Sequence, residues 1–436
     1  MQGGLVVGAC ILLGNITGFF RVAVTAYLLG THGAADALAV ALGPIDTVNS
    51  VVVNTMLFAF VPMLLLRQNG DRGALFARAT RIYIWIFAAI SAATALFAPQ
   101  WIAVLGPGLA APERAQAIAL LRWLAPSTFF GASASVFSAL LYSERRFLVP
   151  GLYQTCLNGA SITGALLLWR SMGVNGFAIG YSVGAGFELC LTWFFTRGLR
   201  SAPRSEWEAP MPDILLKPGM FLLYAGLIAG NLIVTRIFAT HAGPGMAASF
   251  DYCMRCVSVV LAYLVYPAAS TLVPEIARLR GTNETAKAYS LIDKGVAVMA
   301  VAAVLSCALG VALRKPVIAL LFQRGSFTRQ STELVSAVFL GFAPSLIGWS
   351  LLDVIARCFF ALDRPKLPVG AAFVPISVNI AITWTLYATG RLTSPAALGL
   401  GASAGLFLGF AGLFTAVHVR RPAKVLSSQS SVISLR

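Results

Sequence analysis

Charged side chains are scarce in this chain. Asp, Glu, Lys and Arg make up 11% of the 436 residues and hydrophobic residues make up 58%, whereas a soluble domain carries about 25% charged residues. Polar stretches long enough to form a soluble domain are also missing. Runs of roughly 20 apolar residues recur along the chain, and each is long enough to cross about 30 Å of hydrocarbon as a helix. We therefore expect an all-α polytopic membrane protein.

Common catalytic and metal-binding motifs are absent as well. The three histidines, His32, His241 and His418, lie far apart in sequence, and the Cys253–Cys256 pair stands inside an apolar stretch with no second pair nearby. The sequence contains no nucleotide-binding P-loop and no arguable Ser/His/Asp arrangement. We therefore expect no enzymatic activity and no cofactor. Any driving energy would come from the membrane potential, a monovalent ion or the flow of substrate.

The apolar runs predict about twelve transmembrane helices. The expected spans cover residues 3–30, 34–66, 80–107, 115–142, 148–169, 173–199, 215–240, 244–278, 286–313, 330–361, 367–388 and 394–419. The longest polar connection divides six spans from six. We predict an N-terminal six-helix lobe over 1–199, a cytoplasmic linker over 200–213, a C-terminal six-helix lobe over 214–419 and a cytoplasmic tail over 420–436.

The net charge of +16 comes from Lys and Arg residues that collect in every second loop. With the N-terminus inside, twenty of these residues fall on the cytoplasmic side and seven on the outer side, which is the positive-inside pattern of membrane proteins. Both termini are therefore predicted to be cytoplasmic, and no nucleic-acid partner is expected. Residues 314–329 are the exception, because they place four positive charges outside.

The two halves of the chain look like copies of one another. Residues 124–150 align without gaps on residues 342–368, at an offset of 218. Glycines that would let helices pack closely recur in the same order, at Gly176, Gly180 and Gly184 and again at Gly401, Gly405 and Gly409. Copies with six helices each face the same way and are related by an axis along the membrane normal. We predict two pseudo-symmetric lobes that rock around a central cavity.

Some charged residues nevertheless lie inside the predicted spans. Each costs about 2.5–3.5 kcal/mol at a helix centre on insertion scales, so such groups are kept where they face water or each other. Together with the net positive charge of the chain, they indicate a polar path for an anionic cargo. Eleven such residues are singled out: Arg21, Asp36, Asp46, Arg122, Glu188, Arg236, Asp251, Arg255, Glu275, Asp353 and Arg357.

Arg21 and Asp36 have no oppositely charged partner at helical spacing. Arg21 lies near the middle of its span. A guanidinium group binds phosphate through two parallel hydrogen bonds. We expect Arg21 to bind a phosphate or diphosphate group. Asp36, near the outer end of the next span, is expected to orient an arginine.

Two further acid–arginine pairs are spaced four residues apart, Asp251 with Arg255 and Asp353 with Arg357. This spacing places both side chains on one face of a helix. Two interpretations stay open: each pair is a buried structural ion pair, or Arg255 forms part of an anion-binding wall.

Several stretches resemble the MurJ/MviN lipid II flippases, within the multidrug/oligosaccharidyl-lipid/polysaccharide exporter superfamily. They are GFFRVAVTAYLLGTHGAADALAVAL (18–42), AFVPML (59–64), LFQRGSFT (321–328) and residues 342–368. The resemblance implies two lobes around a central cationic cavity. It also implies transport of an undecaprenyl-diphosphate-linked cell-wall precursor from the inner to the outer leaflet of the bacterial cytoplasmic membrane. Arg21, Asp36 and Arg255 fall on charged cavity positions of this family.

The chain also departs from that family, as a divergent and shorter member. Asn15 stands where an earlier arginine is usual, Asn49 and Ser50 stand where another is usual, and two further C-terminal helices are not found. The candidate residues of the substrate-binding cavity are the charged Arg21, Asp36, Arg255 and Asp251 and the polar Asn15 and Asn49.

These departures leave other functions open. The chain could move a different lipid-linked unit, for an exopolysaccharide or O-antigen. It could be a cation-coupled multidrug exporter, in which Asp46 and Glu188 would dominate, or a membrane scaffold that transports nothing. The expected partners are a lipid-linked glycan, membrane lipids and envelope-synthesis proteins, and the expected state is a monomer.

Overall fold

The fold is described from a computed structural model that covers residues 2–67, 69–199, 211–282 and 284–419. These residues form helices joined by short loops, and no strand occurs among them. Most of the predicted linker, at 200–210, and the predicted tail, at 420–436, lie outside the described residues.

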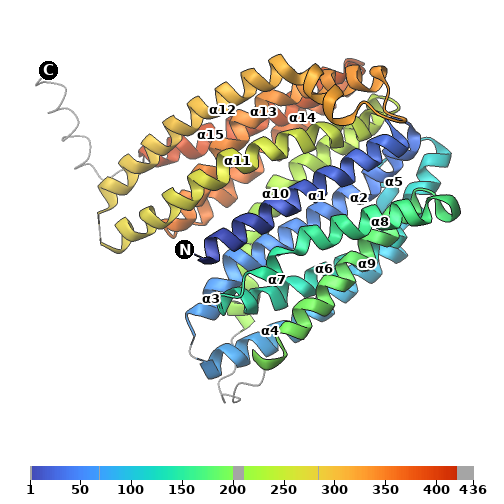
Figure 1. The fold of residues 1–436 in the computed structure, drawn as a ribbon. Helices are drawn as coiled ribbons and strands as arrows, with labels where there is room; N and C mark the ends of the chain where they lie inside the picture. The colour runs from blue at the N-terminus through green and yellow to red at the C-terminus, as the bar shows by residue number, and fades with distance from the viewer. Residues whose placement is uncertain (1, 68, 200–210, 283, 420–436) are drawn as a thin grey trace, which may run out of the picture. The chain divides into compact units, whose positions relative to one another are not determined.

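The first half of the chain forms the helices of the six predicted N-terminal spans (Figure 1). Their bounds are α1 Gln2–Leu29, α2 Gly33–Thr55, a π-helical turn Met56–Phe60, α3 Val61–Leu65, α4 Asn69–Leu96, α5 Ala98–Leu105, α6 Ala111–Ser143, α7 Leu148–Gly151, α8 Tyr153–Met172, α9 Asn175–Phe195 and a 3₁₀ turn Arg197–Leu199. The third span begins earlier than predicted and is broken into α4 and α5.

The second half forms six long helices. Their bounds are α10 Met211–Ala242, α11 Met246–Gly281, α12 Thr285–Phe322, α13 Arg329–Ala361, α14 Lys366–Ala388 and, after a 3₁₀ turn Pro395–Gly399, α15 Leu400–Val419. Eleven of the described helices are long and apolar enough to cross a membrane. The other predicted span corresponds to α8, whose length fits but whose polar residues lower its hydropathy.

By its internal contacts the chain divides into two compact units. The first contains the chain up to residue 229 together with 236–252 and 318–334, and the second contains 230–235, 253–317 and the chain from 335 onward. The turn that joins α10 to α11 and the turn that joins α12 to α13 therefore pack with the first half of the sequence. The predicted lobe boundaries stay a prediction.

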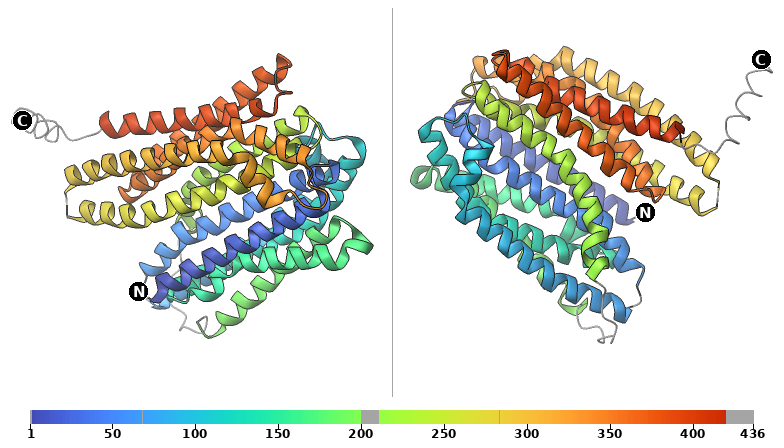
Figure 2. Two further views of the ribbon diagram at one scale, coloured as in Figure 1. Left: turned by 45° about the horizontal axis from the view of Figure 1, so that its top comes forward. Right: turned by 180° about the vertical axis from the view of Figure 1, so that it is seen from behind.

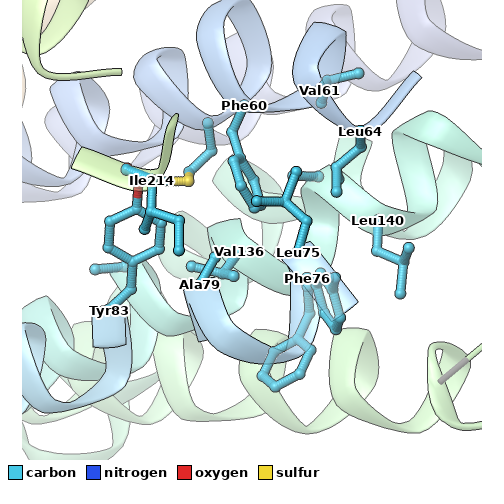
Figure 3. Close-up of a cluster of buried hydrophobic side chains, with 14 of the residues drawn as sticks. Phe60, Val61, Leu64, Leu75, Phe76, Ala79, Tyr83, Val136, Leu140 and Ile214 are labelled. Carbon is cyan, nitrogen blue, oxygen red and sulfur yellow. Dashed lines mark hydrogen bonds between the residues drawn. The ribbon is translucent and has the colours of Figure 1, made fainter. Parts of the chain in front are cut away.

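The first unit has an aromatic core at one end of α4 (Figure 3). Phe60, Leu64, Leu75, Phe76 and Ile214 are among its buried side chains. Ile214 belongs to the first turns of α10, and its carbonyl accepts a hydrogen bond from the Tyr83 hydroxyl. The chain that follows the predicted linker is therefore anchored on the N-terminal half.

Both glycine ladders pack on the helix that precedes them in sequence. In the first unit, a Cβ atom on Gly180 of α9 would lie 3.0 Å from the Ser161 Cα atom of α8, and closer still to the carbonyl of Ala160. In the second unit, a Cβ atom on Gly405 of α15 would lie 2.9 Å from the Pro375 Cα atom of α14. The helices α14 and α15 run side by side in Figures 1 and 2. The predicted packing role of these glycines is confirmed.

The duplication also appears in the backbone at the ends of α6 and α13. Arg145 and Asp363, which differ by 218 in sequence number, both adopt left-handed conformations, with φ of 58° and 59°. In each case the next amide donates a 2.9 Å hydrogen bond back into the helix, from Arg146 to Leu141 and from Arg364 to Phe359. This is the hydrogen bond of a Schellman C-cap. Two non-glycine residues in this rare conformation at equivalent positions support descent from one repeat.

The close approach of α8 and α9 gives a test of the packing. We expect Gly180→Ala to destabilise the protein by about 1–3 kcal/mol, because its methyl group would force two backbones apart. Gly159→Ala on α8 is the matched control, since a Cβ atom there meets nothing within 4 Å. Thermal unfolding of the purified variants should show a lower midpoint for the first and an equal or higher midpoint for the second. Equal midpoints for both variants would contradict the packing role.

Candidate functional site

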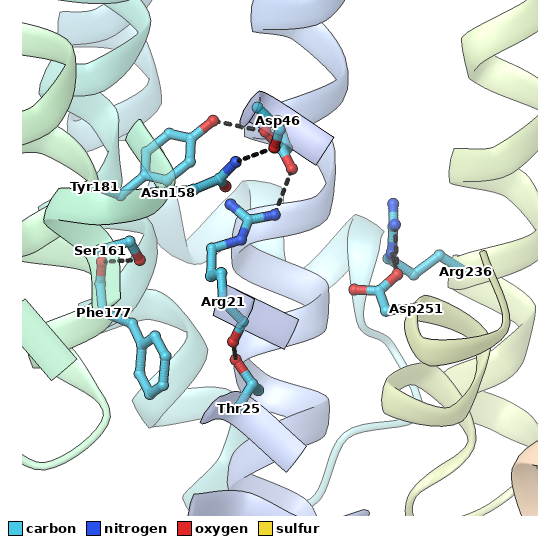
Figure 4. Close-up of polar contacts among 10 residues, drawn as sticks. Arg21, Thr25, Asp46, Asn158, Ser161, Phe177, Tyr181, Arg236 and Asp251 are labelled. Carbon is cyan, nitrogen blue, oxygen red and sulfur yellow. Dashed lines mark hydrogen bonds and ion pairs between the residues drawn. The ribbon is translucent and has the colours of Figure 1, made fainter. Parts of the chain in front are cut away.

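Arg21 lies on α1 and meets side chains from two other helices (Figure 4). Its Nη2 atom is 2.9 Å from Oδ2 of Asp46 on α2. The Tyr181 hydroxyl of α9 donates a 2.6 Å hydrogen bond to Oδ1 of the same carboxylate. The guanidinium carbon also lies 5.6 Å from the centre of the Tyr181 ring, a cation–π distance. We call these three residues the Arg21–Asp46 site.

The Arg21–Asp46 site is partly open and has an unused donor. The Arg21 side chain is 13% exposed and that of Asp46 is 41% exposed. The other terminal nitrogen of Arg21, Nη1, is buried and has no hydrogen-bond partner among the described residues. A buried donor without a partner costs about 1–3 kcal/mol, and an anionic oxygen is a strong acceptor for a guanidinium N–H. The Arg21–Asp46 site therefore has one unsatisfied donor on Arg21 among the described residues.

The pairing of Arg21 with Asp46 could not be predicted from the sequence. Asp46 was one of the charged residues inside the predicted spans, but it lies 25 positions from Arg21, on a neighbouring helix. Pairing across helices depends on how each helix is rotated, so residue spacing carries no signal for it. The predicted role of Arg21 as a phosphate ligand stays a prediction.

Asp36 was expected to orient an arginine, but its hydrogen-bond partners are backbone amides. Its side chain is 5% exposed, and its two carboxylate oxygens accept hydrogen bonds from the backbone amides of Gly245 at 2.5 Å and Ala248 at 2.8 Å. These amides belong to the first turn of α11 and the residue before it. The first amides of a helix have no intrahelical partner and favour negative charge. Asp36 thus caps α11 from a distant part of the sequence.

The Asp36 cap is part of a junction between the two sequence halves, all of it within the first unit. The Tyr252 hydroxyl donates a 2.7 Å hydrogen bond to the Gly30 carbonyl. The Ser326 amide donates a 2.8 Å hydrogen bond to the Tyr27 carbonyl, and the hydroxyls of Thr31 and Ser331 are 2.9 Å apart. We call this set of contacts the Gly30 junction.

The Gly30 junction includes part of the unexpected positive stretch 314–329. Its LFQRGSFT motif turns back on the end of α1, with Phe322 and Phe327 packed around Tyr252 at centroid distances of 5.5 and 5.3 Å. Arg324 donates a hydrogen bond of 3.2 Å to the Leu320 carbonyl near the C-terminus of α12, an end that favours positive charge.

Asp251 pairs with an arginine of the preceding helix. Nε and Nη2 of Arg236 on α10 lie 3.1 and 2.6 Å from one oxygen of Asp251 on α11. The guanidinium packs on Gly43 of α2, where a side chain would displace it. Arg236 was among the intramembrane charges but was not a predicted site residue, because this pairing also crosses between helices.

A family model described as lipid II flippase MurJ matches residues 25–435. The chain belongs to the lipid II flippase MurJ family. It is 25% identical to a probable lipid II flippase MurJ of Rhizobium meliloti (strain 1021), over 87% of this chain and 74% of that protein. It is 23% identical to another from Vibrio cholerae, over 96% of this chain and 83% of that protein.

Solved structures of the same fold include MurJ itself and multidrug transporters. A lipid II flippase MurJ in an inward closed conformation matches with a TM-score of 0.81 and 18% identity, over 97% of this chain and 89% of that one. A MATE family transporter of the MOP superfamily matches with a TM-score of 0.78 and 12% identity, over 93% and 94%. The predicted fold class and family are confirmed, and the chain is a multi-pass protein of the bacterial inner membrane.

The two asparagines at the usual MurJ arginine positions lie in different surroundings. Asn15 on α1 is half-buried. Asn49 on α2 is 1% exposed, and both polar atoms of its side chain lack hydrogen-bond partners among the described residues. A Cβ atom on Gly131 of α6 would lie 3.7 Å from that amide. Asn49 therefore lies in the packed contact between α2 and α6, and its predicted cavity role stays untested.

Arg255 and the Asp353–Arg357 pair belong to the second unit. Arg255 lies on α11, and its predicted part in an anion-binding wall stays a prediction. The pair predicted from the spacing of Asp353 and Arg357 on α13 is confirmed, with Nε of the arginine 3.0 Å from Oδ2 of the aspartate. Residue spacing succeeded here because both partners lie on one helix.

The sequence interpretation missed a buried polar cluster in the second unit. The side-chain amide of Asn379 on α14 donates hydrogen bonds to the Asn231 side chain at 2.8 Å and to the Thr235 hydroxyl at 2.9 Å, both on α10. The Thr383 hydroxyl donates to the Asn379 oxygen at 2.9 Å. Uncharged residues scattered over two helices gave no signal in the sequence.

The Asp36 cap leads to a stability prediction for the Gly30 junction. We expect Asp36→Ala to cost about 1–3 kcal/mol, because the amides of Gly245 and Ala248 would lose their acceptors. Hydrogen–deuterium exchange should then become faster at these two amides. Asp36→Asn keeps one acceptor oxygen, so its exchange should fall between wild type and Asp36→Ala. Unchanged exchange in Asp36→Ala would contradict the capping role.

Proposed function

We propose that this chain translocates a polyprenyl-diphosphate-linked glycan precursor of the cell envelope, lipid II or a related unit, across the cytoplasmic membrane. Membership of the MurJ family supports a transporter rather than a catalyst. The observation that carries the proposal for the cargo is the Arg21–Asp46 site. One donor of Arg21 is held by Asp46, and the other is buried and has no partner among the described residues.

The chemistry of this site suits a diphosphate. Once a movement of the helices uncovers Nη1 of Arg21, a phosphate oxygen would accept a hydrogen bond from it without breaking the ion pair with Asp46. The exposed side of Asp46 would then repel the incoming charge and compete for the same guanidinium. Such competition limits how tightly the cargo is held, which a transporter needs because the cargo must also leave.

The proposed topology follows the positive-inside pattern, with both termini in the cytoplasm. The Gly30 junction then lies at the outer face, so its hydrogen bonds would have to open before a head group could leave outward. The isoprenoid tail would stay in the lipid. The membrane potential would drive this step, since moving one elementary charge through 100 mV is worth about 2.3 kcal/mol.

The asparagines at positions 15 and 49 favour a second cargo of the same chemical class. With Asn49 packed against α6, fewer arginines are available than the resemblance implies for lipid II. An exopolysaccharide or O-antigen unit on the same lipid carrier would present the same diphosphate to Arg21. We further propose that the protein acts as a monomer, with envelope-synthesis proteins as partners.

Substitution of Arg21 tests the proposal directly. Charge-assisted hydrogen bonds contribute about 1.5–3 kcal/mol, so Arg21→Ala should slow translocation of lipid II by roughly tenfold or more in proteoliposomes. Arg21→Lys keeps the charge but loses the planar donor pair and should be intermediate. Asp46→Asn removes the competing carboxylate and should tighten diphosphate binding while slowing release.

The matched control for these variants is Arg278→Ala. Arg278 is exposed and pairs with Glu275 three residues earlier, so its loss should leave translocation unchanged. All variants should elute as folded protein in size-exclusion chromatography. Full translocation of lipid II by folded Arg21→Ala would refute the proposed role, and rescue of a strain depleted of its lipid II flippase would separate lipid II from other lipid-linked units.

A further inference from the structure

Glu188 is a carboxylic acid buried inside the first unit. It lies on α9, seven residues before the last residue of that helix, and its relative exposure is 0%. The helix packs tightly on α8 through Gly184, one turn earlier, where a Cβ atom would lie 2.6 Å from the Cys156 carbonyl oxygen. Glu188 is therefore enclosed by protein on a helix that spans the membrane.

Neither carboxyl oxygen of Glu188 has a hydrogen-bond partner of ordinary geometry among the described residues. The titratable groups that face it are Cys156 and Tyr153 on α8 and Tyr142 on α6. The Cys156 thiol is a weak donor at most. The segment α7, Leu148–Gly151, contains no titratable side chain, and Arg197, in the turn after α9, lies over the Trp193 ring.

A carboxylate in these surroundings would be an isolated buried charge. Burying an ionised group without a partner costs far more than burying the neutral acid, so such a group takes up a proton. A metal cation fits less well, because hard cations need about six oxygen ligands. The described residues include no group of three or more acidic, His or Cys side chains placed to hold one.

Glu188 and the Arg21–Asp46 site share a helix, α9, and a neighbouring side chain, Tyr153. Tyr181 and Glu188 are seven residues apart, so they share one face of α9 about two turns apart, roughly 10 Å along the axis. Tyr153 of α8 lies within electrostatic range of Glu188, of Asp46 and of Arg21. Tyr181 in turn donates its hydrogen bond to Asp46. Because charges in a protein interior of low dielectric interact over such distances, a change of charge at Glu188 is expected to reach the place where the anion would bind.

We propose that Glu188 is a proton-binding site that controls the affinity of the Arg21–Asp46 site for a diphosphate. With the proton bound, Glu188 is neutral and the site keeps the full attraction of Arg21 for the anion. Loss of the proton places a second negative charge about two helical turns from Tyr181, and this charge weakens the attraction of the site for the anion. Because such coupling is reciprocal, binding of the diphosphate also favours uptake of the proton. This inference rests on the proposed function, because it links the binding of the proposed cargo to pH.

Binding of farnesyl diphosphate to the purified full-length protein in detergent tests the coupling. The range from about pH 6 to about pH 9 is suitable, because documented buried glutamates titrate as high as about pH 8–9. The affinity of wild type should fall by about tenfold with rising pH, relative to Glu188→Gln, which mimics the neutral acid throughout. The ionisation of the probe itself affects both proteins equally, so only the difference between them counts.

The matched control is Glu284→Gln, outside the membrane-spanning segments. A hydrogen bond from Lys287 lowers the pKa of Glu284, so this residue is already ionised over the whole range. Glu284→Gln should behave like wild type. The coupling is refuted if wild type and Glu188→Gln share one pH dependence, or if the folded Glu188→Gln variant binds no probe. It is equally refuted if wild-type affinity follows the sodium concentration and not pH.

Infrared difference spectroscopy reports the proton without any ligand. A carboxylic acid C=O band should be present in wild type at low pH, disappear as the pH rises, and be missing from Glu188→Gln. Absence of that band from wild type would refute the proton site, even if transport proceeds. A wild-type protein that shows the band but binds the diphosphate at no pH would instead count against the proposed cargo.

Discussion

A charge inside the hydrocarbon layer must be neutralised, and this requirement explains where the polar groups of the first unit lie. Arg21 forms an ion pair with Asp46, and Arg236 forms one with Asp251. Asp36 is matched by the backbone amides at the start of α11. Glu188 has no such match among the described residues, and a proton is the simplest group that can neutralise it. Nη1 of Arg21 also has no hydrogen-bond partner among the described residues.

Close helix packing makes this arrangement of charges possible. Glycines on α9 let α8 approach so closely that a methyl group would clash with its backbone. The same contact fixes the face of α9 that carries both Tyr181 and Glu188. Small residues thereby position the polar ones, and the second unit repeats the packing where α15 meets α14.

The sequence predicted the fold well, and one part of the candidate site. Eleven predicted spans correspond to helices that are long and apolar enough to cross a membrane, because an apolar run of about 20 residues has few other stable forms in lipid. The Asp353–Arg357 pair was also predicted, since helical geometry alone brings residues four apart together. The partners of Arg21, Asp36 and Asp251 were missed, because they come from other helices.

The sequence by itself determined the membrane-spanning class, the internal duplication and the family, because these depend on composition, spacing and motifs along one chain. Only the tertiary structure decided which charged side chains form ion pairs. It also showed that Glu188 is buried without a cationic neighbour among the described residues. The physical reason is that a helix in lipid is apolar on every side. No polar face then marks which way it is turned, and its rotation is set by packing against its neighbours.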